Sequence, residues 1–167
     1  MCGIVGLWDR SGGQIDPVVL GRFTDSLSHR GPDGRGQYLS LDNSLGLGHR
    51  RLSILDLTSR GKQPMSFANN RYHITYNGEI YNFLEIRKTL IGRGYSFFTE
   101  TDTEVILAAY TEWGVSCQEK FNGMWAFAIW DETEKVLFMS RDRYGAKPLY
   151  YFQCRNVFGF ASELKAF

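Results

Sequence analysis

The chain opens with Met1-Cys2-Gly3-Ile4-Val5-Gly6, and this stretch decides how the rest of the sequence is interpreted. If Met1 is removed, Cys2 carries both a thiol nucleophile and a free α-amine. An N-terminal amine can act as the base for its own side chain, because its ordinary pKa of about 7.7–8.0 is close to neutral pH. Alternatively, Cys2 is a small buried residue that opens a strand, since free cysteine is among the most buried residue types.

The composition is that of an ordinary globular protein of one domain. The 167 residues are 43% hydrophobic and 22% charged, with a formal net charge of +1, and a chain of this length can bury a substantial core. Scattered lysines and arginines argue against binding to nucleic acid, and the apolar runs are too short to cross a membrane. Asp9 and Arg10 interrupt the first apolar run, which therefore does not resemble a secretory signal.

Cysteine and histidine spacing argues against three further classes of protein. The three cysteines contain no CxxC pair, which disfavours a thiol redox protein and a disulfide framework and favours a reducing, cytoplasmic setting. The three histidines lack the spacing of a zinc site, so no metal is expected.

The order of predicted elements indicates an α+β fold. Residues 3–9 are predicted to form a strand, and Asp16-Pro17 predicts the N-cap and first residue of a helix that Gly31-Pro32 stops. Further strands are predicted at 37–41, 45–52, 72–76, 124–130, 136–140, 149–152 and 157–160, and further helices at 82–91, at 101–113 and from 162. This order lacks regular βαβ alternation.

Asn77-Gly78 is a candidate oxyanion hole, because it follows a predicted strand and precedes a predicted helix. An asparagine amide and an adjacent backbone N–H form a suitable donor pair for a tetrahedral oxyanion. However, Asn-Gly between two elements is also the commonest kind of turn. Without further context, the turn is the better interpretation.

Two charged residues are candidates for binding the ends of an amino acid. Arg51 ends the predicted hairpin and could hold a carboxylate in bidentate fashion, although a solvated strand end is the plainer interpretation. Arg50 and Arg51 are adjacent on a strand, so only one of them can enter a given pocket. Asp102 could pair with an ammonium group, cap the helix that begins there, or do both, because a carboxylate has two oxygens.

Taken together, these segments resemble the glutaminase domain of the asparagine synthetase family, a class II (N-terminal nucleophile) glutamine amidotransferase. The resemblance covers the whole chain in order. It rests on MCGIVG at 1–6, HRGPD at 29–33, RLSILD at 51–56, YNGEIYN at 76–82, TDTE at 101–104, GMWAFAIWD at 123–131, RDRYGAKPLYY at 141–151 and ASELKAF at 161–167. RLSI, NGEIYN and ASELK favour the asparagine synthetase branch over relatives in purine or amino-sugar synthesis.

The resemblance implies a four-layer α/β/β/α sandwich of the N-terminal nucleophile hydrolase type, with residues 1–167 forming one glutaminase domain. It implies that Cys2 is the nucleophile with its α-amine as base, and that Asn77 and the Gly78 N–H form the oxyanion hole. The implied substrate-binding residues are Arg51 for the glutamine α-carboxylate, Asp102 and Glu79 for the α-amino group, and backbone groups around Leu52 and Ile54.

The implied reaction is hydrolysis of L-glutamine to L-glutamate and ammonia through a Cys2 thioester. The ammonia would be supplied to a C-terminal synthetase domain that forms asparagine from aspartate and ATP. That domain is absent from this chain, which has no Ser-Gly-Gly-x-Asp-Ser pyrophosphate loop. No cofactor is expected here, because ATP and Mg would belong to the missing domain. A homodimer is a further option.

Retention of Met1 would change this interpretation. A retained methionine would convert the catalytic amine into an amide, which cannot act as a base. The alternative function is therefore a non-catalytic glutamine-binding or scaffold domain.

Overall fold

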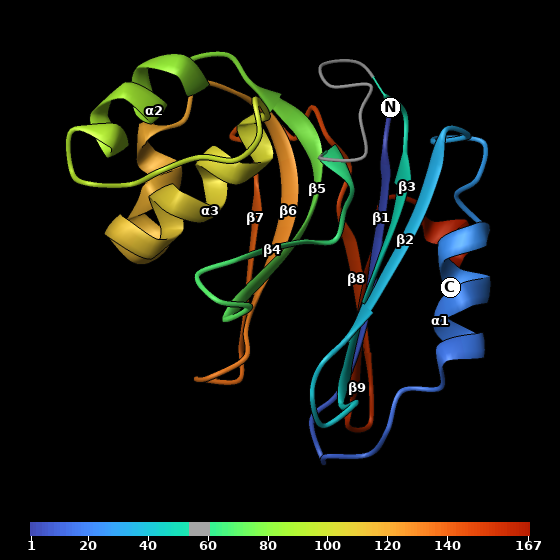
Figure 1. The fold of residues 1–167 in the computed structure, drawn as a ribbon. Helices are drawn as coiled ribbons and strands as arrows, with labels where there is room; N and C mark the ends of the chain where they lie inside the picture. The colour runs from blue at the N-terminus through green and yellow to red at the C-terminus, as the bar shows by residue number, and fades with distance from the viewer. Residues whose placement is uncertain (54–60) are drawn as a thin grey trace.

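Two antiparallel sheets are stacked face to face, and helices cover their outer faces (Figure 1). The computed structural model describes residues 1–53 and 61–167, so Ile54 lies outside the described residues. The arrangement confirms the four-layer α/β/β/α sandwich that the resemblance implied.

The first sheet has five strands in the order β2-β3-β1-β9-β8. Its strands are β1 (Gly3–Asp9), β2 (Gly34–Leu39), β3 (Leu45–Arg51), β8 (Tyr150–Cys154) and β9 (Val157–Ala161). Helix α1 (Pro17–Asp25) packs on its outer face, and the short 3-10 helix η3 (Leu164–Ala166) ends the chain beside it.

The second sheet has four strands in the order β4-β5-β6-β7. Its strands are β4 (Met65–Phe67), β5 (Tyr72–Ile80), β6 (Gly123–Asp131) and β7 (Val136–Arg141). Helices α2 (Phe83–Ile91) and α3 (Asp102–Trp113), with the 3-10 helix η2 (Gly114–Lys120), cover its outer face.

The two-residue period of the strands divides their side chains between two cores. On β6, Ala126, Ala128 and Trp130 face the first sheet, whereas Phe127 and Ile129 pack toward α2 and α3. The small alanines and the large tryptophan fill the space between the sheets together, so a single strand contributes to both layers of the core.

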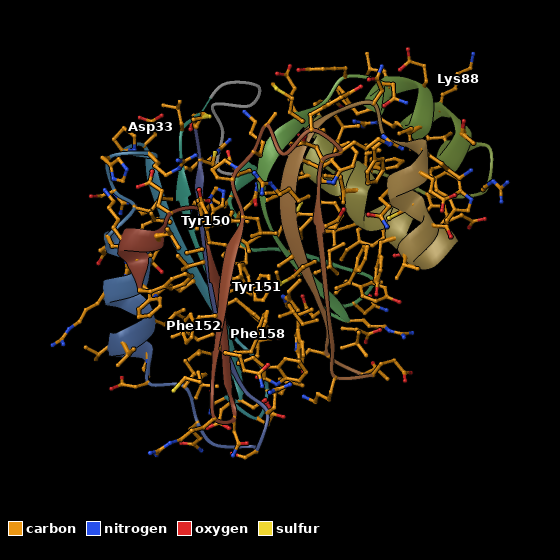
Figure 2. All side chains as sticks on the ribbon, turned by 180° about the vertical axis from the view of Figure 1, so that it is seen from behind. Asp33, Lys88, Tyr150, Tyr151, Phe152 and Phe158 are labelled. Atoms are coloured by element: carbon orange, nitrogen blue, oxygen red, sulfur yellow. The ribbon has the colours of Figure 1, made fainter. Side chains whose placement is uncertain are left out.

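The strands β8 and β9, at one edge of the first sheet, likewise place aromatic side chains on both faces of that sheet (Figure 2). Phe152 packs in the cluster beneath α1, whereas Phe158 of β9 packs toward the second sheet. Tyr151 stacks against Phe158 with ring centroids 5.9 Å apart, but it remains largely exposed at the open edge of the sandwich.

Helix α1 begins as predicted and ends earlier. Asp16 is its N-cap and accepts a hydrogen bond from the Val18 N–H at 2.7 Å. The helix ends at Asp25, not at the predicted Gly31-Pro32, because the backbone turns of residues 26–30 make i to i+3 hydrogen bonds, including Arg30 N–H to the Leu27 carbonyl.

The largest correction concerns Asn77-Gly78, which does not form a turn. β5 runs on through both residues to Ile80, in register with β6, so that Asn77 pairs with Ala126 and Gly78 with Trp125. Pairing along the full length of β6 outweighs the local turn preference of Asn-Gly, because each added pair brings ladder hydrogen bonds and buried contacts.

Three smaller differences between the predicted and observed elements concern β4, η2 and the helix expected from residue 162. The sequence analysis did not predict β4 or η2, which are short and lack a clear hydrophobic period. The helix expected from residue 162 is only the 3-10 turn η3. α3 agrees with its prediction, because Thr101 is the N-cap and Gly114 ends the helix with a φ of 57°.

Candidate active site

The residues singled out by the sequence converge at the end of the sandwich where β1 begins and β3 ends (Figure 1). A cavity of about 130 Å³ lies there. It is lined by Met1, Cys2, Arg51, Leu52, Gly61, Gln63, Tyr76, Asn77, Gly78, Glu79, Thr101, Asp102, Thr103 and Lys147. Seven of the eight expected site residues are therefore brought together, and the eighth, Ile54, lies outside the described residues.

Cys2 is held through both its side chain and its backbone carbonyl. Its Sγ accepts a hydrogen bond from the Leu52 N–H at 3.4 Å and lies 3.6 Å from the Leu52 carbonyl oxygen. The Cys2 carbonyl accepts from Arg30 Nε at 2.9 Å. Burial raises the pKa of the Cys2 thiol, although the Leu52 N–H, the N-terminus, Arg51 and Arg30 each oppose the rise. The resting group is therefore a thiol, which needs a base before it can attack.

The side-chain amide nitrogen of Asn77 donates no hydrogen bond to any described residue. Its side chain is only 2% exposed, and Nδ2 has no hydrogen-bond partner in the described part of the chain. A buried donor without a partner costs free energy, so such groups are rare in folded proteins. An amide in this state beside a thiol is suited to donate to an oxygen of a bound substrate.

The backbone around Asn77 is fixed from the first sheet. His49 on β3 donates from Nε2 to the Tyr76 carbonyl at 3.1 Å, which ties the two sheets together next to Asn77. Burial lowers the pKa of His49 to about 4, so the imidazole is neutral at pH 7. At Gly78, any Cβ would overlap the Met124 carbonyl oxygen and the Tyr76 ring, which explains why glycine stands there.

Asp102 is the first residue of α3, and the N-cap is Thr101. The Asp102 carboxylate accepts from the Tyr76 hydroxyl at 2.7 Å and from the Ile80 N–H at 3.0 Å, so it joins α3 to β5. Burial raises its pKa, because only 4% of the residue is exposed, while these hydrogen bonds oppose the rise. The prediction that Asp102 caps this helix is therefore wrong, because Thr101 is the N-cap. The Asp102 carboxylate instead links α3 to β5.

Arg51 and Glu79 supply opposite charges to the cavity wall. Arg51 is half-buried at the end of β3, and Glu79 is exposed near the end of β5. Arg50 points away from this site, with Nε bound to the Gly31 carbonyl at 3.2 Å and a guanidinium nitrogen 3.6 Å from Asp25. The expectation that only one of the two arginines enters the pocket is confirmed.

The sequence analysis did not identify several lining residues. Gln63 accepts from the Tyr76 N–H at 2.6 Å and donates to the Thr103 hydroxyl at 3.3 Å, so it supports the wall beneath Asn77. Nothing in the spacing around Gln63 pointed to this role. Lys147 lay within a recognised segment, 141–151, but nothing in that segment distinguished it as a site residue.

Two larger hollows lie away from Cys2. One, of about 400 Å³, is walled by Trp8, Met139, Tyr151 and Phe158, and the other, of about 470 Å³, lies between β4 and the loop before α3. Their described lining residues include no cysteine or histidine.

Within residues 1–53 and 61–167 no group of three or more acidic, histidine or cysteine side chains could hold a metal ion. No helix in the same ranges is long and apolar enough to span a membrane.

The fold is that of the N-terminal nucleophile amidotransferases. The structure superposes on the glutamine phosphoribosylpyrophosphate amidotransferase from Bacillus subtilis with a TM-score of 0.83, covering 99% of this chain and 43% of that chain. The sequence identity of 23% limits this likeness to the fold.

Sequence comparison is more specific. The model of the glutamine amidotransferase domain family matches residues 1–167. The chain is 40% identical over 169 residues to "Asparagine synthetase [glutamine-hydrolyzing] 1" of Bacillus subtilis, and 42% identical over 181 residues to the putative asparagine synthetase 2 of Methanocaldococcus jannaschii. Each alignment covers 99% of this chain but only 26% and 34% of the relative. This chain belongs to the glutamine amidotransferase domain family.

Proposed function

We propose that this domain hydrolyses L-glutamine to L-glutamate and ammonia, with Cys2 as nucleophile and its free α-amine as base after removal of Met1. Two observations carry the proposal: Cys2 and Asn77 line one cavity, and the buried Nδ2 of Asn77 has no hydrogen-bond partner among the described residues. A nucleophile and a donor without another partner are the two groups that acyl transfer needs side by side.

In this reaction the Cys2 sulfur attacks the side-chain amide carbon of glutamine, and the thiol proton passes to the α-amine. Asn77 Nδ2 and the Gly78 N–H donate to the oxyanion. As the carbon–nitrogen bond breaks, the amine returns its proton to the leaving nitrogen, releasing ammonia and leaving a thioester. Water then attacks the thioester, yields glutamate and restores the thiol.

Glutamine is zwitterionic at its α-carbon, so selective binding needs a cation and an anion. Arg51 supplies the guanidinium that would hold the α-carboxylate, and Glu79 and Asp102 supply the carboxylates for the α-ammonium. Backbone groups of Leu52 complete this end of the cavity, with Ile54 proposed from the sequence alone.

The ammonia would pass to a synthetase domain that forms asparagine from aspartate and ATP. This part of the proposal is supported by the names of the relatives and by lengths, because the chain spans about a quarter to a third of the relatives it matches. The glutaminase domain itself would need no cofactor, and a reducing cytoplasm would keep Cys2 as a thiol.

The test combines intact mass with ammonia release. We expect the mass to show loss of one methionine and Cys2→Ala to abolish glutamine hydrolysis. Cys117→Ser and Cys154→Ser are matched controls, since Cys117 is buried, with its thiol pKa raised to about 12 by burial, and Cys154 is exposed on β8. Activity that survives in Cys2→Ala but disappears in either control would refute the assignment.

A second candidate, a non-catalytic glutamine-binding domain, is favoured if Met1 is retained. Met1 lines the cavity, and its sulfur lies 3.6 Å from Lys147 Nζ. Retained Met1 together with glutamine binding and no ammonia release would select this function.

A further inference from the structure

Lys147 brings to the cavity a cation that the reaction proposed above does not use. Its side chain is half-buried and lines the same cavity as Cys2, and its Nζ lies 3.6 Å from the Met1 sulfur. Within the part of the chain that the structure describes, no carboxylate lies within ion-pair distance of this ammonium. Its charge is therefore not matched by a described carboxylate, and it lies on the same cavity as Cys2.

The backbone of Lys147 is held from both sides. Its N–H donates to the Asp142 carboxylate at 2.9 Å, and its carbonyl accepts from Arg141 Nε at 2.9 Å. Asp142 is itself buried and also accepts from the Ala146 N–H at 2.9 Å. The lysine side chain thus starts from a fixed point on the cavity wall, and no described carboxylate forms an ion pair with its ammonium.

Charged groups also face this position from the other elements. Arg51 at the end of β3 and Arg30 after α1 are cations, and both lower the pKa of the Cys2 thiol against the larger effect of burial. Arg30 is matched by Glu163, 2.8 Å from its guanidinium. In the proposed complex, Arg51 would be matched by the glutamine α-carboxylate.

The carboxylates on the opposite wall are Glu79 on β5 and Asp102 on α3. Asp102 is bound by the Tyr76 hydroxyl, whose own pKa burial raises well above its ordinary range, so this phenol carries no charge. In the proposed complex both carboxylates would face the glutamine α-ammonium. Lys147 is then a wall cation that neither a carboxylate of the described residues nor the substrate neutralises.

We propose that Lys147 is a positioning residue for the N-terminal base: after Met1 is removed, its ammonium acts across the shared cavity on the new N-terminus and favours the neutral, proton-accepting form of the Cys2 α-amine. The inference rests on the proposed function, because it takes that amine as the base. Two neighbouring cations repel each other, so the amine loses its proton at a lower pH than it would without Lys147. The same charge favours the Cys2 thiolate.

The first test is the pH dependence of kcat/KM for glutamine in protein whose mass shows removal of Met1. Lys147→Gln should move the acidic limb of the profile to higher pH by about half to one pH unit, because the protonated amine is no longer destabilised. Lys147→Arg should restore the limb of the unsubstituted protein. Lys88→Gln makes the same charge change on exposed helix α2 (Figure 2) and should leave the profile in place.

The second measurement needs no turnover. In a Cys117→Ser, Cys154→Ser background, the rate of Cys2 alkylation by iodoacetamide should titrate at higher pH in Lys147→Gln than in the unsubstituted protein or Lys147→Arg. If the unsubstituted protein releases no ammonia, the proposed function fails, whereas the alkylation profiles still decide the role of Lys147. Superimposable profiles for Lys147→Gln and the unsubstituted protein would overturn the inference, as would equal shifts in Lys147→Gln and Lys147→Arg. Lys147→Met provides the same test if Lys147→Gln does not fold.

Discussion

Asn77 and His49 show how single residues prepare the candidate site before any substrate binds. His49 holds the carbonyl of Tyr76 across the gap between the sheets, and the next residue along β5 carries the unpartnered amide. Burial keeps the imidazole of His49 neutral and leaves Asn77 Nδ2 without a partner among the described residues. At neutral pH only the unpaired donor costs free energy, which the surrounding fold must supply.

Asn77→Ala should lower turnover far more than it weakens glutamine binding. The amide is placed to meet charge that develops in the transition state, and loss of one such donor typically lowers kcat by about 10²–10³-fold. Steady-state kinetics measure the two effects separately. Asn156→Ala, in the exposed turn between β8 and β9, serves as the matched control. An unchanged kcat with a raised KM would instead make Asn77 a ground-state binding residue.

The buried imidazole of His49 should make the free energy of unfolding decrease as the pH falls. Its pKa falls from the ordinary 6.5 to about 4 on folding, so the unfolded chain binds more protons between these values. The stabilisation is therefore complete above pH 6.5 and is lost as pH falls toward 4. From pH 8 to pH 5 this group should lower the free energy of unfolding by about 2 kcal/mol.

Urea unfolding at the two pH values measures this loss. His49→Gln keeps a donor for the Tyr76 carbonyl but does not titrate, so its pH dependence should be shallower. Asn156→Ala, in the exposed turn between β8 and β9, changes no titratable group and should keep the slope of the unsubstituted protein. An unchanged slope in His49→Gln would show that burial of a neutral imidazole at position 49 is not the cause.

At the scale of elements, β5 decides the geometry of the site. It carries Tyr76, Asn77, Gly78 and Glu79 in extended conformation along β6, so that neighbouring residues point to opposite faces. Tyr76 consequently reaches Asp102 on the α3 side, while the peptide at Asn77 faces the first sheet. A turn at Asn77-Gly78 would have dispersed these groups.

Gly78→Ala tests whether this continuity matters. The new methyl group would overlap backbone of β6, and such overpacking typically costs about 1–3 kcal/mol. We expect a lower Tm together with reduced glutamine turnover, measured by thermal unfolding and ammonia release. Gly92→Ala, at the exposed end of α2, places its methyl group at ordinary contact distances and is the control. Normal stability in Gly78→Ala would show that β5 and β6 can separate there without cost.

At the scale of the whole molecule, the site exists because the two sheets pack against each other. Cys2 and Leu52 belong to the first sheet and its end, whereas Asn77 and Asp102 belong to the second sheet and its helix. The inter-sheet core includes Ile4, Leu47 and Trp130, all fully buried. Loss of this packing should therefore disturb both stability and the meeting of nucleophile and donor.

Trp130→Ala should lower the free energy of unfolding by about 3–5 kcal/mol, because it leaves a large cavity between the sheets. Trp130 also loses an edge-to-face contact with Trp8, whose ring centroid lies 5.5 Å away. Urea unfolding followed by fluorescence and by circular dichroism gives the measurement. Tyr151→Ala removes an aromatic side chain that is 71% exposed and should cost about 1 kcal/mol or less. Equal costs for the two variants would contradict a core shared by both sheets.

Local chemistry made much of this fold predictable from the sequence. Asp16 and Thr101 cap helices, Gly114 ends one, and a continuous apolar run marks β6, because each pattern acts over a few neighbouring residues. The recognised segments likewise named seven of the residues that line the cavity. The turn assigned to Asn77-Gly78 was wrong because local preference was weighed without the strand that pairs with it.

By itself, the sequence determined an α+β order of elements and the helix boundaries set by caps, and its family resemblance indicated the layer arrangement and which residues are candidates for chemistry. Tertiary structure alone decided that β5 continues through Asn77-Gly78, that Asp102 joins α3 to β5, and that Gln63 and Lys147 enter the cavity wall. The physical reason is the separation along the sequence of the residues that make contact. Caps and periodicity arise from contacts a few residues apart, whereas the contact between Cys2 and Leu52 spans 50 residues and forms only when the sheets assemble.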